Sequence, residues 1–310
     1  MRKTLLTAIT ALGAGLAMVL GTGPSTAQPE AGRWHQVGGD VRSGISGLTV
    51  TYRSGSELRA LVVRDNKRPG ENRIAEVTHR LGRPAEVAAI SWQDGIEPVD
   101  LEAVDAVPGT SDEFVAVASR GLAYHFKLTD AGEAAKVLDI APLPAIGAGD
   151  DFESFALTAR NGKMAALWAD RGEGADRPAT LYAAPFSISS YGESEFGEVR
   201  KATLRAPYPK GNVRHASDIE VSKSGRVLVS SASDAGDDGP FDSAVSDAGR
   251  LTVTRAGQVR LTVAKSPELL DKFDGHKIEA LHCVPGSGLA ALGTDDENAG
   301  GSLTTRRLCD

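Results

Sequence analysis

Four glutamates lie in similar short apolar frames along this chain. The frames are DLEAV around Glu102, DFESF around Glu153, SDIEV around Glu220 and KIEAL around Glu279. A carboxylate in a strand that becomes buried is costly unless it has a partner. Glutamates that recur in this way therefore indicate a shared acidic site. A weaker copy of the frame, GISGL, has Ser46 where the glutamate would stand.

Each frame is followed by a glycine-containing turn and a second apolar run, which is the pattern of a β-hairpin. The five motif positions lie 51 to 67 residues apart, a period that fits four-stranded blades. We predict an all-β, five-bladed β-propeller closed by an N-terminal strand around Trp34 and Val37. The long interval between Glu153 and Glu220 leaves six blades open. A two-sheet sandwich is the alternative, but it does not explain five equivalent hairpins. One short helix is expected over Ser266–Gly275, with Ser266 as its cap.

The repeated carboxylates predict a metal site. If the first strand of each hairpin is innermost, the glutamates face the central channel near one mouth, where aspartates that end the second strands also gather. Like charges so close together raise one another's pKa, and a hard cation such as Ca²⁺, which accepts six to eight oxygen ligands, relieves that conflict. The expected ligands are Glu102, Glu153, Glu220, Glu279 and Asp65, and the further strand-end aspartates are Asp170, Asp234 and Asp295.

A structural role is the alternative for these glutamates, which arginines at neighbouring hairpin ends, such as Arg64, Arg120 and Arg171, could neutralise. The sequence leaves open whether the channel mouth is catalytic.

Two histidines lie close before the glutamate frames. His215 precedes Glu220 by five residues and His276 precedes Glu279 by three. A histidine on a loop at the mouth can serve as a general base near neutral pH, although an ordinary surface residue is the alternative. Three cations on the same loops could attract an anionic substrate: Lys210, Arg214 and Lys277.

The first 27 residues have the features of a secretory signal peptide: a basic start, an apolar stretch and small residues before Ala27. A membrane anchor is the alternative, which the weak apolar content disfavours. The mature chain, residues 28–310, forms a single domain. Without Arg2 and Lys3 it has 32 basic and 41 acidic residues, a formal net charge of −9. We therefore expect a secreted, extracellular monomer with no nucleic-acid and no membrane partner.

Cys283 and Cys309 are the two cysteines of the chain and lie 26 residues apart. In an oxidising compartment we expect them to form a disulfide, which would contribute roughly 3 kcal/mol by closing that loop.

The glutamate frames, together with SGL at Ser46–Leu48 and RDN at Arg64–Asn66, resemble the "esterase-like activity of phytase" family of secreted propellers. More distantly, they resemble β-propeller phytases and gluconolactonase-type propellers. The resemblance implies a calcium-binding propeller with phosphoesterase or esterase action on a small anionic or ester substrate. This sequence differs from the family pattern in that Glu-Ala, Glu-Ser and Glu-Val replace the usual Glu-Gly.

No G-x-S-x-G, H-E-x-x-H or P-loop pattern occurs in the sequence. The leading hypothesis is a Ca²⁺-dependent hydrolase of phosphoesters or esters, in which metal-bound water attacks a phosphoryl or carbonyl group whose oxygen the ion polarises. The alternative is a non-catalytic, metal-stabilised propeller that binds an extracellular ligand or protein.

Overall fold

The computed structural model describes residues 32–309. The signal peptide expected over residues 1–27 lies outside this range. No helix within the described range is long and apolar enough to cross a membrane.

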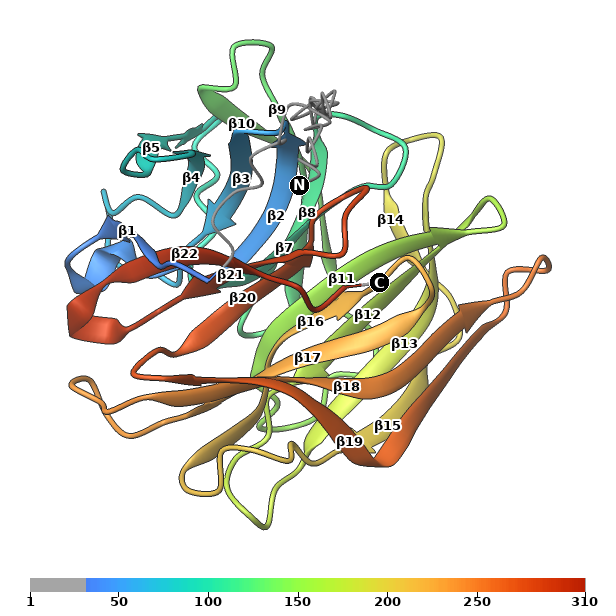
Figure 1. The fold of residues 1–310 in the computed structure, drawn as a ribbon. Helices are drawn as coiled ribbons and strands as arrows, with labels where there is room; N and C mark the ends of the chain where they lie inside the picture. Colours follow the sequence, from blue (N-terminus) through green and yellow to red (C-terminus); the bar gives the residue numbers. More distant parts are fainter. Residues whose placement is uncertain (1–31, 310) are drawn as a thin grey trace, which may run out of the picture.

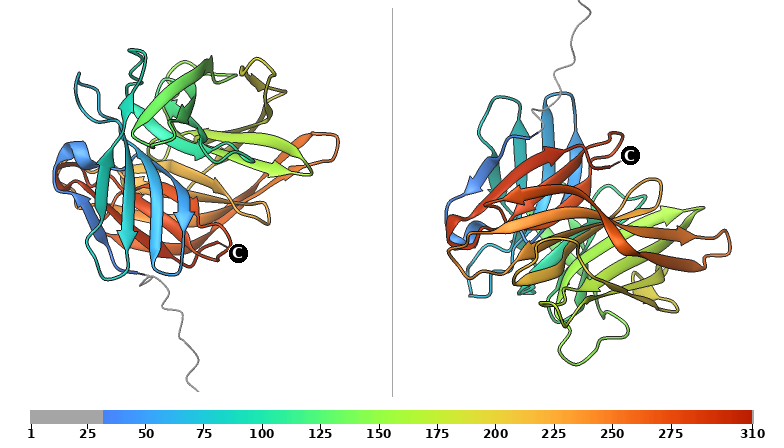
Figure 2. Two further views of the ribbon diagram at one scale, coloured as in Figure 1. Left: turned by 90° about the horizontal axis from the view of Figure 1, so that it is seen from above. Right: turned by 60° about the horizontal axis from the view of Figure 1, so that its bottom comes forward.

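Five antiparallel sheets surround a central axis, as the two views of Figure 2 show, and form the blades of a β-propeller. Blade 1 consists of β2 (Gly47–Arg53), β3 (Glu57–Val63), β4 (Ile74–Arg80) and β5 (Glu86–Ala89). Blade 2 consists of β7 (Leu101–Ala106), β8 (Glu113–Ala118), β9 (Leu122–Leu128) and β10 (Ala134–Pro142), with β6 (Ser91–Trp92) parallel to β10 at its edge. The all-β prediction with five blades is confirmed.

The remaining blades follow the same order from the axis outward. Blade 3 consists of β11 (Phe152–Arg160), β12 (Lys163–Asp170) and β13 (Ala179–Ile188), whose outer edge pairs with both β14 (Ser194–Phe196) and β15 (Arg200–Leu204). Blade 4 consists of β16 (Val213–Val221), β17 (Arg226–Ser233), β18 (Asp242–Val253) and β19 (Val259–Asp274). Blade 5 consists of β20 (Ile278–Cys283), β21 (Ala290–Thr294), β22 (Gly301–Arg306) and β1 (His35–Gly38). Two single turns of 3₁₀-helix, η1 (Val41–Ser43) and η2 (Glu297–Ala299), lie in the connections.

The N-terminal strand closes the ring as predicted. β1 is the outermost strand of blade 5 and pairs antiparallel with β22, where His35 faces Leu303. The first and last parts of the described chain thus share one sheet (Figure 1). The predicted disulfide is also present: Cys283 and Cys309 are joined with a Cα–Cα distance of 5.8 Å. It fixes the C-terminal segment to the inner strand β20.

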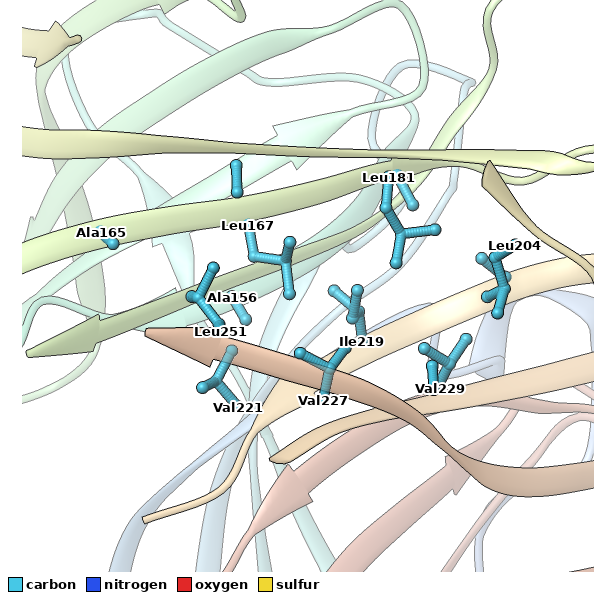
Figure 3. Packing of buried hydrophobic residues seen from close by; sticks show 14 of the residues in the cluster. Ala156, Ala165, Leu167, Leu181, Leu204, Ile219, Val221, Val227, Val229 and Leu251 are labelled. Atoms are coloured by element: carbon cyan, nitrogen blue, oxygen red, sulfur yellow. The ribbon is translucent and has the colours of Figure 1, made fainter. Parts of the chain in front are cut away.

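The core lies between neighbouring blades, because each sheet has a neighbour on both faces. Between blades 3 and 4, Leu167 and Leu181 pack against Ile219, Val229 and Leu251, all 2% exposed or less (Figure 3). Burying an aliphatic side chain of this kind contributes roughly 1.5–3 kcal/mol. Packing on both faces explains why the second strands of the hairpins are continuous apolar runs instead of alternating ones.

The expectation of a short helix over Ser266–Gly275 is wrong, because residues 266–274 belong to the long outer strand β19. Asp274 and Phe273 pair with Asp242 and Ser243 of β18, so the neighbouring strand supplies the backbone hydrogen bonds that a helix would have made internally. Pro267 falls where the register shifts on an edge strand. A proline without an N–H is tolerated at such a place.

Candidate functional site at the channel mouth

Three of the repeated glutamates lie at β-bulges at the start of an inner strand. Glu102 lies between Leu101 and Ala103, where the register of β7 on β8 shifts by one residue. The pairing of β11 and of β20 shifts in the same way at Glu153 and at Glu279. A bulge places two residues opposite one and turns the extra side chain. Here it lets a carboxylate face the channel mouth without removing an apolar residue from the inter-blade core.

In blade 4 the equivalent position holds an arginine, and the prediction that Glu220 shares the mouth is wrong. A backbone hydrogen bond that recurs in four blades identifies the equivalent positions. The residue that follows the second strand donates its N–H to the carbonyl of the residue that precedes the inner strand. Two residues after this acceptor comes the side chain that faces the mouth. The donor–acceptor pairs are Ser119–Asp100, Arg171–Asp151, Asp234–Asn212 and Asp295–Lys277, and the residues two positions on are Glu102, Glu153, Arg214 and Glu279.

These side chains line a central cavity of about 180 Å³, which we call the mouth. Its lining contains eight carboxylates, five cationic side chains and one serine: Asp65, Asp100, Glu102, Asp151, Glu153, Glu279, Asp295, Glu297, Lys67, Arg120, Arg171, Arg214, Lys277 and Ser119. Four of the five predicted metal ligands therefore meet in one place. Of the other strand-end aspartates, Asp295 lines the mouth, Asp234 holds Arg214 at 2.7 Å and Asp170 is held by Arg177 at 2.5 Å.

One half of the mouth is a network of ion pairs, which we call the paired half. Arg214 lies 3.2 Å from Glu279 and 3.6 Å from Glu153, so it bridges two blades. Arg171 lies 2.9 Å from Glu153, and Lys277 lies 3.0 Å from Glu279. Burial raises the pKa of Glu153 to about 7, and Arg214 and Arg171 limit that rise. The structural alternative, in which arginines neutralise the glutamates, therefore holds for Arg171 and Glu153.

The other half, which we call the acidic half, has far less positive charge. One ligand atom from each of Asp65, Asp100 and Glu102 lies within 4.8 Å of those of the other two. Among residues 32–309, the cation that forms ion pairs with them is Lys67, whose Nζ lies 2.9 Å from Asp100 and 3.9 Å from Asp65. Burial and the neighbouring carboxylates of Glu153 and Asp65 raise the pKa of Glu102 well above its usual range.

The acidic half fits a hard divalent cation better than the paired half does. An ion about 2.3–2.6 Å from each of three oxygens requires those oxygens to lie within roughly 5 Å of one another, as they do here. Burial is the larger cause of the raised pKa of both Glu102 and Asp65, and repulsion from neighbouring carboxylates adds to it. Ca²⁺ would counter that repulsion. Glu153 and Glu279, in contrast, already have buried cationic partners.

Neither predicted catalytic histidine lines the mouth. Both ring nitrogens of His215 bond to backbone groups: Nδ1 accepts from Ala206 N at 3.0 Å and Nε2 lies 2.8 Å from the carbonyl of Gly174. Burial lowers the pKa of His215. His276 lies 2.8 Å from Asp296 and packs against the ring of Trp34, with 4.1 Å between ring centroids. In this structure, neither imidazole is placed to take a proton at the mouth.

Glu220 belongs to a separate buried group deeper in the channel, which we call the inner triad: Asp105, Glu220 and His282, from three inner strands. His282 Nε2 lies 3.4 Å from Asp105. Burial raises the pKa of Glu220 to about 8 although His282 lowers it, and the carboxylates of Glu220 and Asp105 raise the pKa of His282 to about 9 against the effect of burial. The frame around Glu220 resembles the others, but it lies six residues beyond Arg214, the residue that takes the glutamate position.

Sequence reasoning missed two residues of the acidic half, Asp100 and Lys67, and the place of Arg214 in the ring. Asp100 directly precedes the frame of Glu102 and Lys67 follows the RDN motif, so both lie beside motifs that were recognised. The position of Arg214 in the ring is identified only by the backbone hydrogen bond between Asp234 and Asn212, which cannot be read from the sequence.

Comparison with protein families finds no family model that matches this chain. No curated protein matches it either. The resemblance to phytase-like propellers thus gains no support beyond the propeller fold.

Solved structures share the fold at low sequence identity. A putative exo-β-1,3-galactanase from Bifidobacterium bifidum has 13% identity and a TM-score of 0.50, over 89% of this chain and 92% of that one. An exo-1,5-α-L-arabinanase from a bovine ruminal metagenomic library has 8% identity and a TM-score of 0.50, over 85% and 93%. The chain spans only 44% of a mutant GH43 protein BlXynB from Bacillus licheniformis, with 72% of this chain covered, 14% identity and a TM-score of 0.42. At these identities the first two structures support the propeller architecture and nothing finer.

Proposed function

We propose that this protein is a secreted, Ca²⁺-dependent hydrolase of small phosphoesters or esters, with its site at the mouth. The observation that carries the proposal is the convergence of Asp65, Asp100 and Glu102 within 4.8 Å, with Lys67 as their one ion-pair partner in the described part of the chain. In this proposal those three carboxylates hold the ion. When bound, Ca²⁺ would supply positive charge that polarises a phosphoryl or carbonyl oxygen.

The side chains of the chain itself would bind and orient the substrate. Arg120 is exposed at the rim and has no ion pair within residues 32–309, so its guanidinium is free to bind an anionic group. Ser119 donates its hydroxyl to Asp100 and so holds that carboxylate in place. The small, wholly polar mouth favours a compact charged group over a large apolar substrate.

Thermal unfolding with EDTA and then with Ca²⁺ tests the metal site. Ligand at 100 times its dissociation constant stabilises a protein by about 2.7 kcal/mol, so saturating Ca²⁺ raises Tm by several degrees. Glu102→Gln should abolish this rise. Glu220→Gln is the matched control, since it removes a buried carboxylate in the same channel away from the mouth, and it should keep the rise. An equal response of both variants, or no Ca²⁺ effect on the unaltered protein, would refute the site.

A substrate screen then tests turnover. Nitrophenyl phosphate and nitrophenyl acetate test the proposed chemistry, and nitrophenyl galactosides and arabinosides are included because two proteins of similar fold are named for such activities. Hydrolysis that requires Ca²⁺ and is lost in Glu102→Gln supports the enzyme.

A non-catalytic, metal-stabilised binding propeller is the second candidate. It is favoured by the paired half, where Glu153 and Glu279 are held by Arg171, Arg214 and Lys277, and by the two histidines that point elsewhere. A Ca²⁺ response that depends on Glu102 without turnover of any substrate in the screen would favour this candidate.

Export rests on the N-terminal sequence and on the disulfide between Cys283 and Cys309. N-terminal sequencing of protein recovered from the culture medium should begin after Ala27, and sedimentation should give a monomer.

A further inference from the structure

The ammonium of Lys67 lies where the proposed ion would have to bind. Its Nζ is 2.9 Å from Oδ1 of Asp100 and 3.9 Å from Oδ2 of Asp65, and both residues belong to the three whose carboxylates converge within 4.8 Å. The hydroxyl of Ser119 donates to the other oxygen of Asp100, Oδ2. Lys67 therefore contacts the oxygen of Asp100 that Ser119 leaves open to an ion.

Lys67 and a divalent ion compete for this position. An ion at about 2.3–2.6 Å from Oδ1 of Asp100 would lie no more than roughly 5.5 Å from an ammonium that is 2.9 Å from the same oxygen. Two cations so close together repel each other, and more strongly in a partly buried site than in water. They would also share the carboxylates of Asp65 and Asp100. Occupation of the site by an ion thus requires the ammonium to move away.

The side chain of Lys67 can move, whereas its backbone is fixed. The buried guanidinium of Arg73 donates to the carbonyls of Asn66 and Arg68, on either side of Lys67, at 2.8 and 2.7 Å. The Lys67 side chain is 62% exposed, and an exposed lysine can leave an ion pair at little cost. Rotation of this side chain can carry the ammonium into solvent while the loop that holds Asp65 keeps its place.

We propose that Lys67 is a built-in competitor of the metal ion. In the ion-free protein its ammonium neutralises part of the acidic half, and it moves into solvent when Ca²⁺ binds. This inference rests on the proposed function, because it takes Asp65, Asp100 and Glu102 as the Ca²⁺ site. The competition lowers the affinity of the three carboxylates for Ca²⁺. Lys67 thereby raises the Ca²⁺ concentration at which the mouth fills, as suits an exported protein, since extracellular Ca²⁺ modules bind weakly.

Calorimetric titration with CaCl₂ tests the proposal on the mature protein, after treatment with EDTA and transfer to metal-free buffer. Lys67→Gln should raise the Ca²⁺ affinity about fivefold, because the ion no longer has to displace a partly exposed ion pair. Lys67→Arg keeps a cation at the same place and should keep the weaker affinity. The direction of the change is diagnostic. If Lys67 instead held Asp100 in place for the ion, its removal would lower the affinity.

The matched control is Lys127→Gln. The Nζ of Lys127 also lies 2.9 Å from an aspartate, Asp112, but neither residue lines the mouth. This variant makes the same charge change and should leave the Ca²⁺ affinity unchanged. Thermal unfolding gives a second readout. At a Ca²⁺ concentration too low to saturate the unaltered protein, the rise in Tm over the EDTA-treated sample should be larger in Lys67→Gln.

The proposal is overturned if Lys67→Gln binds Ca²⁺ no more tightly than the unaltered protein, or if Lys127→Gln gains as much affinity. With the unaltered protein still binding Ca²⁺, either result would leave the proposed function intact. If Ca²⁺ binds to Lys67→Gln and not to the unaltered protein, Lys67 blocks the site, which supports the competition and refutes Ca²⁺-dependent hydrolysis. If Ca²⁺ binds to neither, both proposals fall.

Discussion

In the paired half of the mouth, Glu153 and Glu279 lie within 3.6 Å of a guanidinium that bridges them, whereas in the acidic half a carboxylate oxygen of Glu102 lies within 4.8 Å of those of Asp65 and Asp100. The three glutamates occupy equivalent bulges and are all less than 9% exposed. Their backbone setting is the same, so the difference comes from the charged side chains around each glutamate. Blade 4 contributes Arg214 on one side, and no blade contributes an equivalent arginine on the other.

This contrast teaches that the fold can bury a carboxylate in two ways. A fixed cation makes the site a structural joint between blades, because removing either partner leaves an unpaired charge. A carboxylate without that cation must keep its proton or take up an ion from solution. The second arrangement is the one that leaves room for a ligand, which is why the proposed function is placed on the acidic half.

The largest expected effect comes from removing the bridging cation. Arg214→Met leaves Glu153 and Glu279 buried without this partner, and breaking a buried ion pair in this way costs roughly 3–5 kcal/mol. Urea denaturation of the variant and the unaltered protein measures the difference. Adding Glu153→Gln to Arg214→Met should recover part of the loss, as expected for coupled neighbours. A loss below about 1 kcal/mol in the single variant would show that the two halves are not different in kind.

Glu102→Gln should have a smaller effect with the opposite sign. Burial and like charges raise the pKa of Glu102 in the folded protein, so its ionisation opposes folding above its unfolded pKa, which is near 4.5. Without Ca²⁺ at pH 8, the neutral amide should raise the free energy of unfolding by on the order of 1 kcal/mol. Glu279→Gln is the comparison in the paired half and should destabilise the protein. If both variants shift stability in the same direction, the contrast between the halves fails.

The fold was accessible from sequence because it depends on repeated local patterns. Five hairpins at regular spacing, with an N-terminal strand that pairs with the last blade, are enough to specify a closed ring. The two cysteines, Cys283 and Cys309, are enough to specify the disulfide that holds the C-terminal segment. The segment Ser266–Gly275 misled because helix-capping residues are a weak preference, which the unpaired edge of β18 overrides.

The site was only partly accessible, because its geometry depends on bulges. A bulge adds one residue without altering the composition of a strand, so it leaves no signal in the apolar pattern. Alignment of the sequence motifs makes Glu220 equivalent to Glu153. The backbone hydrogen bonds before the inner strands instead make Arg214 the equivalent of Glu153. The division of the mouth into two halves follows from that one position, and no local pattern marks it.

The smallest effect on stability is expected at the inner triad. Here the cation beside the buried carboxylates is a histidine, His282, which can lose its charge, whereas the arginine of the paired half, Arg214, cannot. Because Glu220 and Asp105 raise the pKa of His282 to about 9 from 6.5, the charged imidazole stabilises the fold fully below pH 6.5 and loses that contribution as the pH rises through about 9. Glu220, with its pKa raised to about 8 from 4.5, acts in the same direction, since its ionisation opposes folding as the pH rises toward 8.

NMR titration of the His282 ring should therefore give an apparent pKa near 9. In Glu220→Gln that pKa should fall toward 6.5, while the free energy of unfolding near pH 5 changes by less than about 1 kcal/mol, because the replaced carboxyl is then mostly protonated in the fold. At pH 9 the variant should be more stable than the unaltered protein. If the pKa of His282 were the same in Glu220→Gln, Glu220 would not interact with the imidazole. The inner triad would then be three independent buried groups, unlike the paired half of the mouth.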